Sequence, residues 1–166
     1  MTSMQEAYCR AALARMCEIN VDRHGKRLKV IPLHFDKNLL INSNSGGQYN
    51  PIRHHIVVVE DEGDTTEHLL LKILHDFRHY WQEQNYPGIF NWWIFESNHL
   101  YGRLRNTKLC AIEEDARVYE RSRGRAGRED LLKCYDRDAF CLLRDEPYIL
   151  ALVLRACGLD SNLFLI

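Results

Sequence analysis

A strand pattern that turns at once into a helix pattern constrains the fold of this chain more than any other feature. The run RHHIVVVE (53–60) is rich in β-branched side chains, which favour a strand. The polar stretch DEGD (61–64) breaks this strand, and Thr65 or Thr66 can cap a helix that we expect over residues 66–84. These segments predict a sheet with a long helix that follows directly from it.

The other patterns are mostly helical. Apolar residues recur at helical spacing over residues 4–19, whereas RLKVIPLHF (27–35) is typical of an extended segment in which Pro32 favours a sheet edge. The stretch NSNSGG (42–47) indicates a loop or turn. Further helices are expected over residues 107–122, 129–143 and 147–158.

The order of these elements is a helix, two or three strands, and then more helices. This order predicts an α+β fold in which a small antiparallel or mixed sheet packs on a helical layer. A chain of 166 residues, 46% of them hydrophobic, fits one globular domain. We therefore expect a single domain over residues 1–166, with the helices at 129–158 as a C-terminal extension.

Two features predict a cytoplasmic protein without a membrane span. The apolar run YILALVLRACGL (148–159) contains Arg155 and is shorter than the roughly 20 apolar residues that a span requires. The first twenty residues lack the apolar core of a signal peptide. The six cysteines form no Cys-x-x-Cys pair, so a cysteine-only zinc site is not expected and the thiols should be reduced.

Charge gives little support to nucleic-acid binding. The formal net charge is −1, so the molecule as a whole is not a polycation. The arginines between Arg117 and Arg128 could contact phosphate, but Glu120, Glu129 and Asp130 dilute them. A solvated helix end with its link is the alternative interpretation of this region.

Two histidines on the expected helix 66–84 form a candidate metal site. In LHDFRHYWQ (74–82), His75 and His79 are four residues apart and therefore project from the same helix face. Neutral imidazoles are good zinc ligands, and a carboxylate beside the first histidine, here Asp76, can take a proton from a metal-activated water. A pair with this spacing also arises by chance on a solvated polar face.

The helix expected at 107–122 offers a third ligand. In CAIEEDARVYE (110–120), Glu113 lies at the edge of the apolar stripe, where a carboxylate is costly unless it is paired or bound to metal, while Glu114 points to the opposite side. Asp115 could accept a hydrogen bond from a ligand histidine, or it could form an ordinary ion pair with Arg117, Arg121 or Arg123. His99, in the segment between the two helices, is a competing third ligand.

These two segments together resemble small zincin-type metallopeptidases of the gluzincin pattern, including the SprT-like and ImmA/IrrE-like groups. Such proteins pair a His-Glu-x-x-His helix with a second helix of the Glu-x-Asp-Ala type. The resemblance implies a zincin-like fold and Zn²⁺ held by His75, His79 and Glu113. It also implies a peptide or protein substrate whose backbone lies along the 53–60 strand, and it places Asp76 at the position of the catalytic base.

Asp76 departs from that family pattern, which has glutamate at this position. Aspartate is one methylene shorter, and a misplacement of about 1 Å can cost on the order of 100-fold in rate. Three hypotheses follow: an active zinc peptidase, a pseudopeptidase that keeps the fold to bind a partner, and a helical structural domain without metal.

Overall fold

The computed structural model of the protein describes residues 1–37, 46–87, 90 and 111–127. The described part contains three helices and one three-stranded sheet, which confirms the predicted α+β class. Its elements, in chain order, are α1 (Ser3–Ile19), β1 (Leu33–Asp36), β2 (Gly47–Asn50), β3 (His55–Val59), α2 (Thr66–Asn85) and α4 (Ala111–Arg121).

The sheet is mixed, and β3 is its central strand. The strand order is β1-β3-β2, with β1 parallel and β2 antiparallel to β3. In β3, Ile56 lies opposite Leu33 of β1 and Tyr49 of β2. The backbone N–H of Ile56 donates to the carbonyl oxygen of Pro32, just before β1 begins. The segment that contains Pro32 therefore leads into an edge strand, as the sequence predicted.

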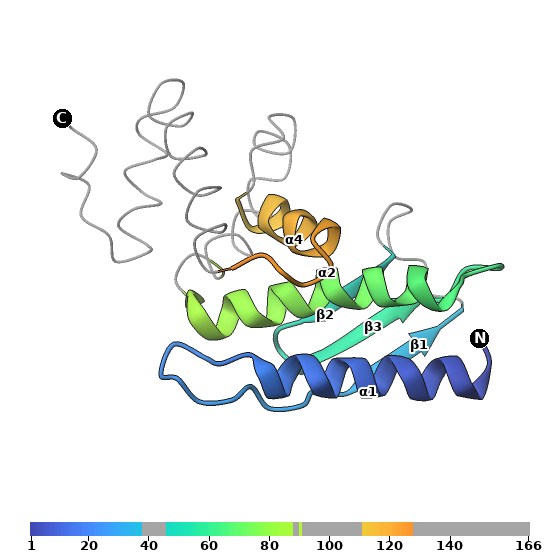
Figure 1. Cartoon of the computed structure of the whole chain (residues 1–166), viewed down its shortest axis with the longest axis horizontal. Coiled ribbons are helices and arrows are strands. Elements are labelled where there is room, and N and C mark those ends of the chain that lie inside the picture. Colours follow the sequence, from blue (N-terminus) through green and yellow to red (C-terminus); the bar gives the residue numbers. More distant parts are fainter. Residues whose placement is uncertain (38–45, 88–89, 91–110, 128–166) are drawn as a thin grey trace, which may run out of the picture.

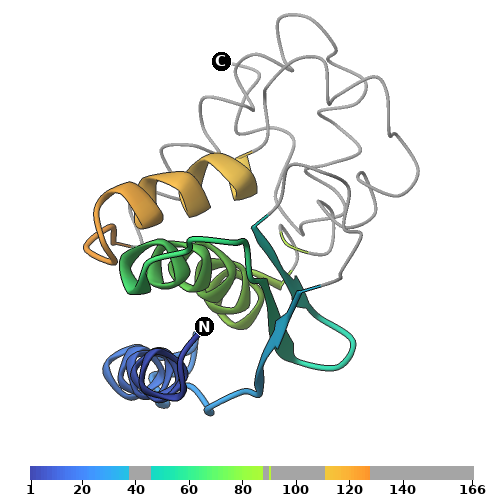
Figure 2. The ribbon, with the colours of Figure 1, turned by 90° about the vertical axis from the view of Figure 1, so that its right-hand side faces the viewer.

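Helix α2 lies between the other two described helices. Figures 1 and 2 show α1 along one side of α2 and α4 along the opposite side, with the sheet packed on α2 from a third direction. Thr65 caps α2, because its side chain accepts a hydrogen bond from the backbone N–H of His68. The helix ends at Asn85, one residue beyond the predicted boundary.

The hydrophobic core fills the space between α1, α2 and the sheet. Its fully buried side chains include Cys9, Leu13, Cys17, Ile56, Val58, Leu69, Ile73 and Phe77. A second face of α2 is buried against α4 and is polar, since it carries Arg78, His79 and Gln82. The sequence interpretation allowed a solvated face here. The structure shows instead that α2 is covered by α1, by α4 and by the sheet.

The sequence predicted two or three strands, but it did not place one at the residues of β2. Gly47 was assigned to the loop 42–47, but it begins β2. Several predicted segments lie outside the described residues. These are residues 42–45 of the expected loop, residues 107–110 of the helix expected at 107–122, and the predicted helices at 129–143 and 147–158. Among the described helices, none has the length and apolar character needed to cross a membrane.

Candidate metal site

His75, His79 and Glu113 come together where α4 crosses α2. Nε2 of His75 lies 3.4 Å from Oε2 of Glu113, and Nε2 of His79 lies 3.5 Å from Oε1 of the same carboxylate. One ligand atom from each residue falls within 4.8 Å of the others, so the three could hold one metal ion. Among the described residues, no other group of three His, Cys, Asp or Glu side chains has this arrangement.

The local structure explains why the two imidazoles converge. A separation of four residues places His75 and His79 one above the other on α2, with ring centroids 5.0 Å apart and nearly perpendicular planes. His79 is buried, whereas His75 and Glu113 are partly exposed, with 24% and 28% of their side chains accessible. The site therefore has a buried end at His79 and an open end toward solvent.

The second nitrogen of each imidazole also has a partner. Nδ1 of His75 lies 3.2 Å from Oε2 of Glu120, two turns beyond Glu113 on α4. Nδ1 of His79 lies 2.9 Å from Oε1 of Gln82 on its own helix. Both imidazoles are therefore held through Nδ1 and turn Nε2 toward Glu113. Partners of this kind orient metal-ligating histidines in proteins.

Asp115 does not accept a hydrogen bond from a ligand histidine in the contacts described, although this was one of its two predicted roles. The side chain is fully buried and contacts Arg78, at 2.7 Å and 3.0 Å, rather than a ligand histidine. Its Oδ2 also accepts a hydrogen bond from the Gln82 amide. The alternative prediction, an ion pair with Arg117, Arg121 or Arg123, named the wrong residues, because the partner is Arg78 of α2. The role of Gln82 was missed, and its position three residues after His79 was the available signal.

Burial and charge shift the pKa values of the three candidate ligands. Burial lowers the pKa of His79, which favours the neutral imidazole that a metal needs. Burial acts in the same direction on His75, but the hydrogen bond and charge of Glu113, with Asp76 and Glu120, raise its pKa overall. Burial opposes ionisation of Glu113, but the two histidines outweigh it and lower its pKa to about 2. A divalent cation would replace the proton that these charges favour on His75.

Asp76 lies beside the triad in sequence, but its carboxylate faces the sheet. The side chain is buried, and it accepts a hydrogen bond from the backbone N–H of Tyr49 in β2. Oδ2 occupies the place that a side chain at Gly47 would need. Burial, reinforced by the charges of Glu113 and Glu120, raises the pKa of Asp76 to about 7. Asp76, the predicted base, is thus hydrogen-bonded to the edge strand β2.

The prediction that the 53–60 strand holds substrate backbone is wrong. β3 pairs with β1 on one side and with β2 on the other, so both of its edges are used. The backbone N–H of Val59 donates to the carbonyl oxygen of Gly46. This bond fixes which residues of β2 point their N–H and C=O groups toward β3 and which point them away. It follows that the N–H of Tyr49 points away from β3. Within the described part of the chain, that side of β2 pairs with no strand and carries the Asp76 contact.

The other predicted site residues take ordinary positions or fall outside the described structure. Glu114 forms ion pairs with Arg117 and Arg121, at 3.8 Å and 3.2 Å, which fits the surface role predicted for it. Arg123 pairs with Glu67 of α2. These arginines of the 117–128 region thus already have acidic partners. His99, the competing third ligand, lies outside the described residues.

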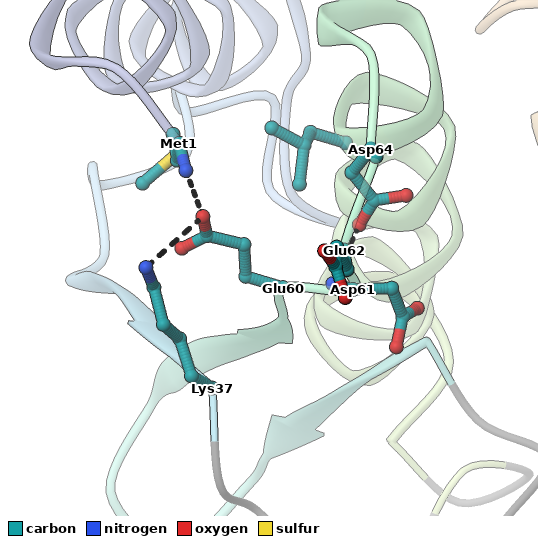
Figure 3. Close-up of a pocket in the computed structure, with 8 residues that line it drawn as sticks. Met1, Lys37, Glu60, Asp61, Glu62 and Asp64 are labelled. Atoms are coloured by element: carbon teal, nitrogen blue, oxygen red, sulfur yellow. Dashed lines mark hydrogen bonds and ion pairs between the residues drawn. The ribbon is translucent and has the colours of Figure 1, made fainter.

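A pocket of about 390 Å³ lies near the N-terminal end of α2 (Figure 3). None of the residues that line it belongs to the triad. Glu60 is ion-paired there with the amino group of Met1 and with Lys37, and Lys72 holds Asp61 and Asp64. The acids of this pocket are therefore balanced mainly by nearby cations. The residues labelled in Figure 3 are Met1, Lys37, Glu60, Asp61, Glu62 and Asp64.

Comparison with protein-family models, with curated proteins and with solved structures found no match to this chain.

Proposed function

We propose that this protein is a zinc-dependent hydrolase of the zincin type, in which His75, His79 and Glu113 bind the metal. One observation carries the proposal: both imidazoles present Nε2 to the same Glu113 carboxylate while their Nδ1 atoms are held by other residues. Two imidazoles and one carboxylate form a donor set used by catalytic zinc sites, in which water takes the fourth position.

Two separations between ligand atoms are close to those expected around such an ion. Ligands at about 2.0–2.1 Å from zinc in a tetrahedral arrangement lie roughly 3.4 Å from one another. The contacts of Glu113 with His75 and His79 are 3.4 Å and 3.5 Å. These two contacts reach different oxygens of Glu113, and single ligand atoms of the three residues lie within 4.8 Å of one another, so the side chains would have to move closer together to share one ion. The partial exposure of His75 and Glu113 leaves an approach for water and substrate.

The proposed reaction is hydrolysis of a peptide bond. When bound, zinc would supply Lewis acidity that makes a water molecule a better nucleophile at neutral pH. Asp76 is the proposed general base, and a carboxyl group with a pKa of about 7 can take up and release a proton near neutral pH. For this role the carboxylate has to leave the backbone N–H of Tyr49 and turn toward the site.

A specific observation favours a second function, in which the protein binds a partner without hydrolysis. The Asp76 carboxylate faces Gly47 and accepts a hydrogen bond from Tyr49 of β2. A carboxylate held in this way ties α2 to the sheet and does not activate water. The same fold with a metal at its centre would then act as a pseudopeptidase.

Metal analysis of the purified full chain tests the zinc site. We expect close to one equivalent of zinc, which Glu113→Gln and His79→Gln should abolish. Glu114→Gln on the same helix is the matched control and should retain the metal. Zinc that neither co-purifies nor binds when it is added back would overturn the proposal.

Peptide cleavage then separates the two functions. The unchanged chain, Asp76→Glu and Asp76→Asn are compared on a broad peptide library with zinc present. Cleavage that Asp76→Asn abolishes supports the hydrolase. If zinc binds but all three forms are equally inert, the pseudopeptidase is the better description.

A further inference from the structure

We infer that Gln82 is a positioning residue that sets the tautomer of His79, and that the buried Arg78–Asp115 ion pair fixes the orientation of Gln82. The contacts alone carry the inference about the tautomer. Its consequence for zinc affinity rests on the proposed function. The inference adds to the candidate site three residues that do not touch the metal-ligating nitrogens.

The first step is the orientation of the Gln82 amide. Nε2 of Gln82 lies 2.9 Å from the carbonyl oxygen of Ile112 and 2.7 Å from Oδ2 of Asp115, and both of these atoms accept hydrogen bonds. An amide NH₂ group has two donors, and here both are used. The reversed amide would place its oxygen against two acceptors. The amide oxygen must therefore face His79.

The second step concerns His79. Its Nδ1 lies 2.9 Å from the Gln82 oxygen, which can only accept a hydrogen bond. Nδ1 therefore carries the hydrogen. In a neutral imidazole the lone pair is then on Nε2, the nitrogen that lies 3.5 Å from Glu113. The amide thus selects the tautomer that can bind a metal together with Glu113.

The third step explains why Gln82 cannot reverse. Asp115 is fully buried and receives two hydrogen bonds from the Arg78 guanidinium. The guanidinium itself lies over the rings of Trp81 and Tyr119, at 3.9 Å and 4.8 Å from their centroids. This packing keeps the Asp115 carboxylate in place as an acceptor for the Gln82 amide.

Arg78 also ties the segment after α4 to the same group. Its guanidinium donates to the carbonyl oxygens of Ala126 and Gly127, at 3.4 Å and 2.7 Å. One buried arginine thus joins α2, α4 and the chain beyond α4. The line of contacts runs from Arg78 through Asp115 and Gln82 to His79, and each step has one geometry that satisfies the donors and acceptors.

The test reads the tautomer directly in the metal-free full chain. With ¹⁵N-labelled histidine, two-bond ¹H–¹⁵N NMR correlations distinguish an imidazole that carries its hydrogen on Nδ1 from one that carries it on Nε2. We expect His79 to be in the Nδ1–H form in the unchanged protein. Gln82→Met removes the amide at similar volume and should give a mixture of tautomers, whereas Gln84→Met on the same helix should leave the spectrum of His79 unchanged.

Zinc affinity, measured by competition with a chelator, gives the second readout. Loss of such a partner costs about 10- to 100-fold in metal affinity, so Gln82→Met should weaken zinc binding by this factor while Gln84→Met should not. An Nε2–H tautomer for His79 in the unchanged protein overturns the inference, even if Gln82→Met does not fold. A folded Gln82→Met variant with an unchanged tautomer also overturns it.

The two proposals can fail separately. If the unchanged chain shows the Nδ1–H form, loses it in Gln82→Met and yet binds no zinc, the positioning role stands and the zinc function is wrong. If zinc binds through the triad but His79 has the other tautomer, the zinc function stands and the role of Gln82 is wrong.

Discussion

Gly47 and Asp76 face each other across the interface between the sheet and α2. A Cβ at Gly47 would overlap Oδ2 of Asp76 and would lie 2.9 Å from the backbone oxygen of Val57. The aspartate therefore fills the space that a side chain in β2 would otherwise occupy. The short side chain at position 76 and the missing side chain at position 47 are a matched pair.

Gly47→Ala should destabilise the protein by about 1–3 kcal/mol, the usual cost of inserting a methyl group where there is no room. Chemical denaturation of the metal-free chain measures this change. Asp76→Ala in the same chain removes the overlapping oxygen, so the double variant should lose less than the sum of the two single variants. Additive losses would show that the two residues do not compete for this space.

Arg78→Met should cost about 3–5 kcal/mol in the free energy of unfolding, because it leaves the buried Asp115 carboxylate without its cation. Arg121→Met is the control, since Arg121 is exposed and should change stability by less than about 0.5 kcal/mol. Urea denaturation of the three proteins makes the comparison. Similar losses in both variants would contradict a special role for the buried pair.

The Asp64–Lys72 pair should make stability depend on pH. Burial tends to raise the pKa of Asp64, but hydrogen bonds from Lys72 and from the backbone N–H of Asp61 lower it overall. A lowered pKa gives a contribution that is present above the ordinary pKa of about 4 and is lost as the pH falls further. Asp64→Asn should thus destabilise the protein at pH 7 and have little effect near pH 2.

Denaturation curves at the two pH values measure this difference. Glu62→Gln, a change of the same kind at an exposed residue of the same loop, should have little effect at either pH. A cost for Asp64→Asn that is equal at both pH values would contradict the assignment to ionisation.

Zinc should raise the melting temperature of the metal-free chain. At a free concentration of 100 times the dissociation constant, binding to the folded state adds about 2.7 kcal/mol. For a chain of this size that corresponds to a rise of roughly 5–10 °C. Calorimetry with and without a chelator measures it. The rise should persist in Glu114→Gln, and a similar rise in Glu113→Gln would place the ion elsewhere.

Cys9 and Cys17 should react slowly with iodoacetamide in the folded protein. Both side chains are fully buried, and burial raises the pKa of both thiols, that of Cys17 to about 11. The thiolate is the reactive form, so at pH 8 few molecules can react. Peptide mass spectrometry before and after denaturation should show labelling of both only when unfolded. Rapid labelling of Cys17 in the native protein would contradict its position in the core.

The sequence predicted those features that depend on contacts close along the chain. The helical periodicity gave α1 and α2 to within a residue or two, and the cap at Thr65 is observed. The position of Glu113 at the edge of an apolar stripe placed it near the histidines, and the structure brings the three side chains together. Whether they bind zinc stays a prediction.

The missed features depend on contacts between distant segments. β2 has only four residues, and its glycine indicated a loop, because the pairing with β3 and the space taken by Asp76 are not visible in the sequence. The central position of β3 was missed for the same reason. The burial of Gln82 was missed, since it arises from the packing of α4 on α2.

A single helix, α4, provides Glu113 to the two imidazoles and Glu120 to the far side of one of them. It contributes both a candidate ligand and a support for another ligand, so the site is complete only after this helix docks on α2. An ion held between α2 and α4 would act as a cross-link between two segments more than thirty residues apart in sequence. Metal content would then report directly on whether the two helices are assembled, and a chelator would loosen the half of the molecule that contains α4 before the half that contains α1.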